Sequence, residues 1–168
     1  MAHLDELNAD RVVVHITGLC RPQPGPGGWC AIIRTEADGG ERVETILVGR
    51  EPETSNIRMQ MQAAIHVVRT LRPEHQATIY TDNEMLVKGV VEWLAGWKAR
   101  NMRNASGAEV KNADLWLQLD EAVQGHPRLS WQWVRRHTDK RFEEAERRAR
   151  QEASKASEER FSLFFQET

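Results

Sequence analysis

Apolar and β-branched residues dominate the first part of the chain. Residues 11–17 read RVVVHIT, which is typical of a strand that is buried on both faces. The segment 20–30, CRPQPGPGGWC, breaks regular structure through its Pro and Gly residues, and the strand pattern resumes over 29–34. A third strand is predicted over 42–49, after a turn at 38–40. The chain therefore opens with an antiparallel meander of three strands.

The hydrophobic period then changes from that of a strand to that of a helix. Residues 57–71 carry one apolar stripe, with a capping segment at 54–56 before it and Pro73 after it. The segment 77–81 is again typical of a strand, and 84–94 returns to helical spacing. This part of the pattern predicts a strand followed by a crossover helix.

Three more elements complete the pattern. Residues 112–123 form an amphipathic helix, 129–134 alternate as a short strand, and about 141–159 form a mostly polar helix. This last helix has a thin stripe of small residues, which predicts close packing on a sheet: Ala145, Ala149, Ala153 and Ala156. The order β-β-β-α-β-α-α-β-α predicts an α/β fold, in which a mixed five-stranded sheet, three antiparallel strands and then two more, is flanked by helices.

Length and composition fit one soluble globular domain. The chain has 168 residues, of which 40% are hydrophobic. We expect an N-terminal extension at 1–10, a domain over 11–158 and a hydrophobic C-terminal tail over 159–168. No run of about 18 apolar residues is present, and the start, MAHLDELNADR, is too acidic and polar for a secretory leader. These features predict a cytoplasmic protein with no membrane partner.

Cysteine content and net charge limit which disulfide and which binding surface the protein can have. Cys20 and Cys30 lie close together near the N-terminus, and we predict two buried thiols and no disulfide. The formal net charge of −2 gives no bulk attraction to nucleic acid. Any polyanion binding must therefore come from a local basic patch.

Several short strings resemble the type I ribonuclease H family, in the family's order and over about residues 11–155. They are PGPGGW at 24–29, RM at 58–59, YTDN at 80–83, EWLAGWKAR at 92–100, VKNADLW at 110–116 and WQWVRRH at 131–137. The resemblance implies the ribonuclease H-like fold. It also implies an enzyme that cleaves the RNA strand of an RNA–DNA hybrid, with two divalent ions held by four carboxylates. Such ions activate a water on one side of the phosphate and stabilise the leaving oxygen on the other.

The resemblance assigns the four carboxylate positions to four residues of this chain. Thr17 stands where the family has the aspartate that bridges both metals, and Gln60 stands where the family has a glutamate. Asp82 matches the aspartate of the middle strand, and Glu146 is the nearest match to the last aspartate. Only Asp82 and Glu146 remain as metal ligands. The formal charge of the set falls from about −4 to −2, which predicts that metal binding is weak or absent.

We therefore predict a ribonuclease H-like module that has lost hybrid-cleaving activity and binds nucleic acid or a protein, with no cofactor of high affinity. The alternative is an active metal-dependent endonuclease with an altered site. In that case Asp82, Glu146 and another acid such as Glu143 hold one ion, Mg²⁺ or Mn²⁺. A third interpretation is a structural domain that serves as an assembly platform. An RNA–DNA hybrid or another nucleic acid is the partner expected for the first two.

The loop after the last strand carries further candidates. His137 stands at the position of a catalytic loop histidine of the family, although the glycines around it are replaced, and its alternative is a plain surface residue. A basic group borders the predicted site and consists of Arg135, Arg136, Lys140 and Arg141. We expect these arginines to replace metals as the electrostatic partner of a phosphate.

Family members with a basic protrusion grip the DNA strand through a segment rich in Trp, Lys and Arg. The matching residues of this chain are Trp93, Trp97, Lys98, Arg100, Arg103 and Lys111. Cations there contact phosphates, while indoles stiffen the segment or stack. The alternative is that the tryptophans pack in the fold and the cations form a solvated rim. Ser55 and Asn56 stand where the family contacts the hybrid backbone.

The C-terminal tail gathers most of the aromatic residues other than tryptophan. Phe161, Leu163, Phe164 and Phe165 lie within RFSLFFQET. A terminus of this kind is either docked on its own domain or free to bind a protein partner through Phe161, Leu163 and Phe164. RFSLF at 160–164 resembles the short peptide by which bacterial replication proteins bind the sliding clamp, with Arg160 in place of the usual glutamine.

Overall fold

The computed structural model describes residues 11–35 and 43–166. The predicted N-terminal extension at 1–10 and the predicted turn at 38–40 lie outside these ranges. No helix in the described part of the chain is both long and apolar enough to span a membrane.

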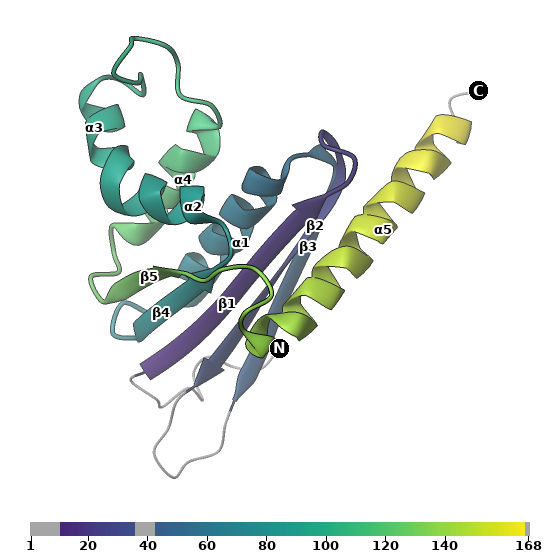
Figure 1. Ribbon diagram of the computed structural model, residues 1–168, viewed down its shortest axis with the longest axis horizontal. Helices are drawn as coiled ribbons and strands as arrows, with labels where there is room; N and C mark the ends of the chain where they lie inside the picture. Colours follow the sequence, from purple (N-terminus) through teal and green to yellow (C-terminus); the bar gives the residue numbers. More distant parts are fainter. Residues whose placement is uncertain (1–10, 36–42, 167–168) are drawn as a thin grey trace.

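Five strands form one mixed sheet with the order β3-β2-β1-β4-β5 (Figure 1). The strands are β1 (Arg11–Cys20), β2 (Gly25–Thr35), β3 (Glu44–Thr54), β4 (Gln76–Thr81) and β5 (Leu129–Trp133). β1, β2 and β3 pair antiparallel, whereas β4 pairs parallel with β1 and with β5. The predicted α/β fold with three antiparallel strands and two further strands is confirmed.

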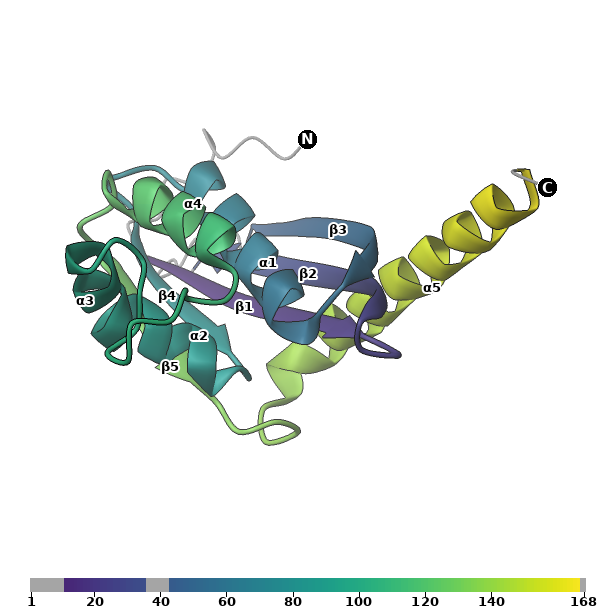
Figure 2. The same cartoon turned by 90° about the horizontal axis from the view of Figure 1, so that it is seen from above.

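Helices cover both faces of this sheet. They are α1 (Asn56–Thr70), α2 (Glu84–Lys88), the π-helical turn η2 (Gly89–Trp93), α3 (Leu94–Ala99), α4 (Ala113–Val123), the 3₁₀ turn η3 (Lys140–Phe142) and α5 (Glu143–Gln166). Figure 2 shows α4 beside α1, and the last turns of α5 extending beyond the strands. Alternate residues of β2 separate the two layers, because Ala31 and Ile33 pack in the cluster that contains α1 while Cys30 and Ile32 pack on α5.

Close helix packing explains why β2 begins earlier than predicted. The strand starts at Gly25 and not at Trp29, so the expected irregular segment is shorter than the sequence indicates. A side chain at Gly28 would place its Cβ 2.4 Å from the carbonyl oxygen of Ala149 and 2.6 Å from the nitrogen of Ala153, both in α5. The glycine-rich strand thus forms a flat surface for the helix. The predicted packing of the alanine stripe is confirmed, with Ala145, Ala149 and Ala156 buried.

Two predicted helices differ from their expected bounds. The single helix predicted over 84–94 is divided into α2, η2 and α3 and continues to Ala99. Gly89, at the start of η2, lies against the indole of Trp116, and a Cβ there would approach it to 2.1 Å. The last helix begins two residues later than predicted and continues to Gln166. The expected boundary between domain and tail at 158 therefore falls inside α5. Cys20 and Cys30 are both free and buried, as predicted.

Candidate functional site

The four positions that the sequence singles out meet at one small polar pocket. Thr17 from β1, Gln60 from α1, Asp82 directly after β4 and Glu146 from α5 all line a cavity of about 160 Å³. They come from distant parts of the sequence and are brought together because β4 runs parallel to β1 and α5 crosses the sheet beside them.

A glycine sets the distance between β1 and α1 at this pocket. A Cβ on Gly18 would lie 2.7 Å from the Cβ of Met59 and 2.8 Å from the backbone nitrogen of Gln60. Only a residue without a side chain permits this approach. Thr17 and Gln60 are consequently almost fully buried at the floor of the pocket, with 3% and 2% of their surface exposed.

Gln60 makes two hydrogen bonds that fix the orientation of its amide. The Thr81 hydroxyl donates to Gln60 Oε1 at 2.8 Å, and Gln60 Nε2 donates to Asp82 Oδ1 at 2.7 Å. The backbone nitrogen of Asn83 in turn donates to the Thr81 hydroxyl at 3.0 Å. In this series of three hydrogen bonds every donor has an acceptor, so the assignment of the Gln60 amide oxygen and nitrogen is consistent with its neighbours.

The electrostatic state of Asp82 follows from this environment. Burial raises the pKa of Asp82 above its usual value, while the hydrogen bond from Gln60 and the positive charge of Arg136 oppose that rise. Glu146 is also shielded, with 14% of its side chain exposed, and its Oε2 lies 3.9 Å from Nδ1 of His137. His137 itself is 70% exposed and has a φ of +64°. The two carboxylates thus face different partners.

Three arginines complete the wall of the pocket. Arg21 follows β1, Arg136 follows β5, and Arg150 lies one turn beyond Glu146 on α5. Of the basic group predicted from the sequence, only Arg136 lines this cavity. Arg21 and Arg150 were missed, because no local motif distinguishes them from other surface arginines. The helical spacing of Glu146 and Arg150 was the one available signal.

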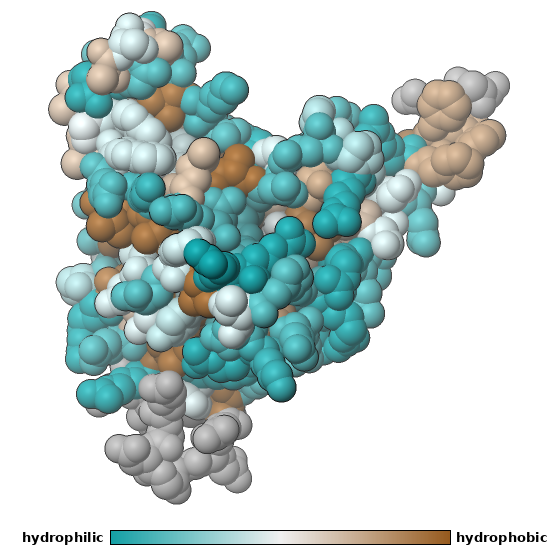
Figure 3. Space-filling model, viewed as in Figure 1, coloured by the Kyte–Doolittle hydropathy of each residue, from teal (hydrophilic) through white to brown (hydrophobic). Residues whose placement is uncertain are grey.

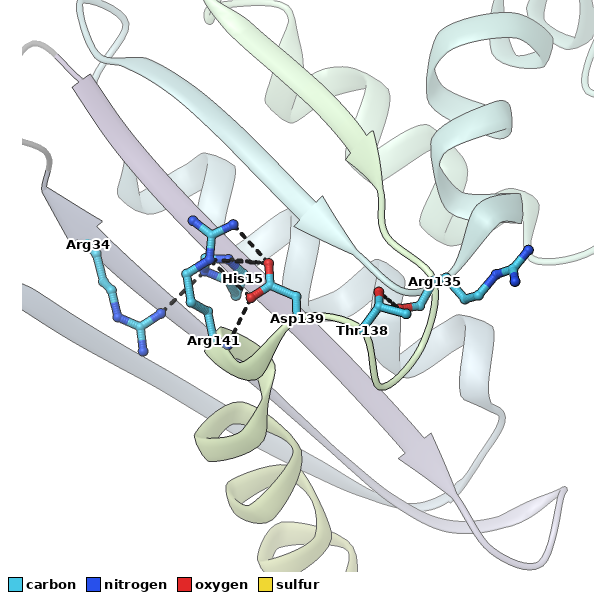
Figure 4. A network of polar contacts seen from close by, with 6 residues as sticks. All are labelled: His15, Arg34, Arg135, Thr138, Asp139 and Arg141. Carbon is cyan, nitrogen blue, oxygen red and sulfur yellow. Dashed lines mark hydrogen bonds and ion pairs between the residues drawn. The ribbon is translucent and has the colours of Figure 1, made fainter.

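Arg141, predicted to border a phosphate, is instead part of a network of polar contacts at the surface that reaches the buried His15 (Figure 4). Its guanidinium donates to both carboxylate oxygens of Asp139, and Asp139 Oδ1 also accepts from the Arg141 backbone nitrogen at 2.9 Å. Asp139 Oδ2 lies 3.9 Å from Nε2 of His15, a fully buried residue of β1. This network holds the end of the loop that carries Arg136.

The protonation of His15 can be read from its neighbours. Arg34 Nη1 lies 3.3 Å from His15 Nδ1, and a guanidinium can only donate, so Nδ1 is the acceptor and the proton resides on Nε2. Burial, followed by the charges of Arg141 and Arg34, lowers the pKa of His15 to about 4. The ring stacks on Tyr80 at a centroid distance of 5.3 Å and is neutral at physiological pH.

Comparison with known proteins identifies the family. The family model for RNase H matches residues 9–156. The chain is 44% identical to Ribonuclease H of Thiobacillus denitrificans over 131 residues, which cover 78% of this chain and 84% of that protein. It is 40% identical to Ribonuclease H of Chromobacterium violaceum over 149 residues, which cover 89% and 96% of the two chains. The chain belongs to the ribonuclease H family.

Solved ribonuclease H structures have the same fold. LC9-RNase H1, a type 1 RNase H with the type 2 active-site motif, superposes with a TM-score of 0.76 at 28% identity, covering 88% of this chain and 74% of that one. LC11-RNase H1, solved in complex with an RNA/DNA hybrid, superposes with a TM-score of 0.63 at 16% identity, covering 86% and 98%. The second likeness concerns the fold alone.

The residues of this pocket do not fit the two-metal centre that the family resemblance implies. Gln60 turns an N–H toward Asp82, where a shared cation would require an oxygen. Thr17 offers a neutral hydroxyl, and the guanidinium groups of Arg136 and Arg150 line the same cavity. Among the described residues, no group of three or more His, Cys, Asp or Glu side chains is arranged to hold a metal ion.

In the segment that was matched to the family's basic protrusion, several side chains have partners within the fold. Trp97 packs against the core, with its ring 5.4 Å from Trp116, and Trp93 lies 5.7 Å from Trp97. Lys98 Nζ lies 2.9 Å from Asp120 Oδ2, and Arg103 donates to the carbonyl of Gly107.

Two cations of the same segment are less constrained. The side chain of Arg100 makes one hydrogen bond with another described residue, to the carbonyl of Arg103, and Lys111 makes no ion pair with another described residue. The packing interpretation therefore fits Trp97, whereas the side chains of Arg100 and Lys111 have fewer partners among the described residues.

Ser55 and Asn56 both have structural tasks at the start of α1. Ser55 caps the helix by accepting from the backbone nitrogen of Arg58. Asn56 Oδ1 accepts from the backbone nitrogen of Cys20 at 2.7 Å, and its own backbone nitrogen donates to Gln23. These bonds tie the turn after β1 to α1. The Asn56 side chain also lines the pocket, so only its Nδ2 group is left for a ligand.

The apolar residues of the tail belong to the end of α5 and are largely exposed. Phe161, Leu163, Phe164 and Phe165 have 57–66% of their surface accessible. They form the brown region at the outer end of the helix (Figure 3). Some of them line an apolar groove with Pro22, Pro26 and Pro52. The helix end is therefore not buried on its own domain in the described structure.

Proposed function

We propose that this member of the ribonuclease H family binds RNA–DNA hybrid without cleaving it. The observation that carries the proposal is the hydrogen bond from Gln60 Nε2 to Asp82 Oδ1. An amide donor there satisfies the carboxylate that would otherwise need a cation. The neutral Thr17 further reduces the negative charge available to hold two dications.

The binding half of the proposal rests on fold and charge. Ribonuclease H1 of similar fold has been solved with an RNA/DNA hybrid bound, and this chain retains cations on its protrusion and around its pocket. Arg100 and Lys111 supply contacts on one side, and Arg136 supplies one at the pocket. Because the net charge is −2, these local cations must provide the whole electrostatic attraction. A cytoplasmic location remains part of this proposal.

A second function, hybrid cleavage with an altered site, is favoured by the relatives. Proteins that are 40–44% identical over most of their length bear the name Ribonuclease H. In that case Asp82 and Glu146, which line one cavity, would hold a single Mg²⁺ or Mn²⁺. Glu143 lines an adjoining depression that Glu146 and Arg150 also line, but it does not line the cavity that contains Asp82.

The role of the tail as a protein contact stays a prediction. Its exposed side chains Phe161, Leu163 and Phe164 are compatible with binding a partner. The likeness to a clamp-binding peptide rests on five residues alone. The assembly-platform interpretation likewise rests on fold resemblance, and no particular described residue supports it.

Equilibrium binding tests the proposed function. A fluorescently labelled RNA–DNA hybrid is titrated with the full chain, once in EDTA and once in Mg²⁺ at equal ionic strength, with duplex DNA and single-stranded RNA as comparison ligands. The proposal predicts hybrid binding of equal affinity in both buffers. Binding that requires Mg²⁺, or no binding to the hybrid at all, would contradict it.

A further inference from the structure

We propose that the pocket formed by β1, β4 and α5 holds one phosphate group of a nucleic acid through Arg21, Arg136 and Arg150, without a metal ion. The inference deepens the proposed function, because it assigns the hybrid-binding activity a specific anion site. It concerns three side chains that come from three separate segments of the chain and line one cavity.

The three arginines differ from most other described arginines in their side-chain contacts, although the charge of Arg136 acts on Asp82. Their side chains form no hydrogen bond or ion pair with another described residue. By contrast, Arg34, Arg50, Arg58 and Arg148 each contact a carboxylate. Guanidinium groups that gather at a cavity without a carboxylate partner are suited to an external anion, since their planar fork matches two oxygens of a phosphate.

The charge of the pocket favours an anion. Three arginines and two carboxylates, Asp82 and Glu146, leave one positive charge in excess when all five are ionised. Asp82 already accepts a hydrogen bond from Gln60, and Glu146 lies near His137. Both carboxylates therefore have contacts outside the group of arginines, and the three arginines line the cavity without a hydrogen bond or ion pair to another described residue.

The size and lining of the pocket fit a phosphate group better than a nucleoside. The volume of the cavity is about 160 Å³. It is well below the roughly 300 Å³ of the smallest pockets that hold drug-sized ligands. The Thr17 hydroxyl and Asn56 Nδ2 are further donors at its wall. A phosphate has enough oxygens to use several of these donors together.

A variant series tests the site through salt dependence. Arg21→Gln, Arg136→Gln and Arg150→Gln are compared with Arg135→Gln and Arg147→Gln, which remove neighbouring arginines that do not line the pocket. Binding of a short labelled hybrid is measured in EDTA over a range of salt. Each pocket variant should weaken binding about tenfold, and neither control should do so.

The combined variant gives the sharpest result. Because the three arginines hold one phosphate, replacing all three should lower the slope of log affinity against log salt by about one unit. A drop of about three units would mean three separate phosphate contacts and would overturn the single site. An unchanged slope would overturn it as well.

Inorganic phosphate provides a probe that does not depend on hybrid binding. In NMR spectra of the full chain, phosphate should shift the side-chain amide of Gln60, and Arg136→Gln should abolish that shift while Arg135→Gln retains it. No phosphate-dependent shift at Gln60 in the wild-type protein would contradict the inference. Hybrids with and without a 5′-phosphate then distinguish a terminal monoester from an internal diester as the source of the group.

The inference and the proposed function can fail separately. If the protein cleaves the hybrid yet loses the phosphate-dependent shift in Arg136→Gln, the proposed function is wrong and the anion site stands. If the hybrid stays intact and the pocket variants bind it as the wild type does with the same slope, the anion site is wrong and the proposed function stands.

Discussion

The side-chain nitrogen of Gln60 lies 2.7 Å from a carboxylate oxygen of Asp82. Thr81 and Asn83 fix the direction of this bond. The Asn83 backbone nitrogen donates to the Thr81 hydroxyl, which donates to Gln60 Oε1, so the Gln60 nitrogen is turned toward Asp82. A glutamate at position 60 would set two carboxylates against each other, and a cation or a proton between them would be needed to relieve the repulsion. With glutamine, the side-chain amide itself donates a hydrogen bond to Asp82, and no cation is needed there.

Gln60→Glu should therefore destabilise the protein at neutral pH. It replaces a buried donor by a second carboxylate next to Asp82, at an expected cost of about 2–3 kcal/mol in the free energy of unfolding. The cost should shrink at acidic pH, where the new carboxyl is protonated and can donate again. Chemical denaturation at two pH values measures both effects.

A surface glutamine gives the matched control for this substitution. Gln124 Nε2 donates to Asp120 Oδ1 at 3.3 Å, but in an exposed position. Gln124→Glu should change the unfolding free energy by less than about 1 kcal/mol. Mn²⁺ should stabilise the Gln60→Glu variant and not the wild type. Equal losses for the two variants would show that the buried bond has no special role.

His15 should make stability fall as the pH falls from about 6.5 to 4. Its pKa is about 4 in the folded protein, mainly because it is buried, and near 6.5 when unfolded. The unfolded chain therefore binds the proton first, which favours unfolding throughout this window. At about 1.4 kcal/mol per pKa unit, the wild type should lose about 2 kcal/mol more than His15→Gln between pH 7 and 4.5. Parallel pH profiles for the two proteins would contradict this.

Arg100 should contribute to hybrid affinity through phosphate contact. Arg100→Glu is expected to weaken binding and reduce the salt slope by about one unit, whereas the same charge change at the exposed Arg69 of α1 should leave the slope unchanged. Lys98 is a less selective target, because its reversal would place a carboxylate against Asp120 and disturb the fold. An identical isotherm for Arg100→Glu would exclude this surface.

Removal of residues 161–168 should leave the fold nearly as stable as before. The described apolar side chains of this segment are more than half exposed, so the unfolding free energy should change by less than about 1 kcal/mol. Ala149→Leu, on the same helix but fully buried against Gly28, should cost several kcal/mol or prevent folding. A large loss on truncation would mean that the helix end docks on the domain.

Much of the fold follows from local sequence patterns. The run RVVVHIT and the helical stripe of residues 57–71 predict β1 and α1 nearly residue by residue, because burial repeats with the period of each element. The early start of β2 could not be predicted, since its glycines are strand residues only because α5 packs on them. The close approach of Gly89 to Trp116, a residue distant in sequence, could not be predicted either.

The site was predictable only where a family string marks it. Thr17, Gln60, Asp82 and Glu146 were named from resemblance, and all four line one cavity. Arg21 and Arg150 carry no such mark and meet only through the folded chain. Conversely, Arg141 looked available in sequence but is engaged by Asp139. Side-chain pairing across elements decides which cations are free, and a single sequence does not reveal it.

Hybrid cleavage is the most direct measure of the central claim. A hybrid labelled on its RNA strand is incubated with excess protein in Mg²⁺ and in Mn²⁺, beside Asp82→Asn under the same conditions. The account predicts that the RNA strand stays intact with both proteins and both ions. Cleavage by the wild type that Asp82→Asn abolishes would contradict it and would identify the chain as an active nuclease.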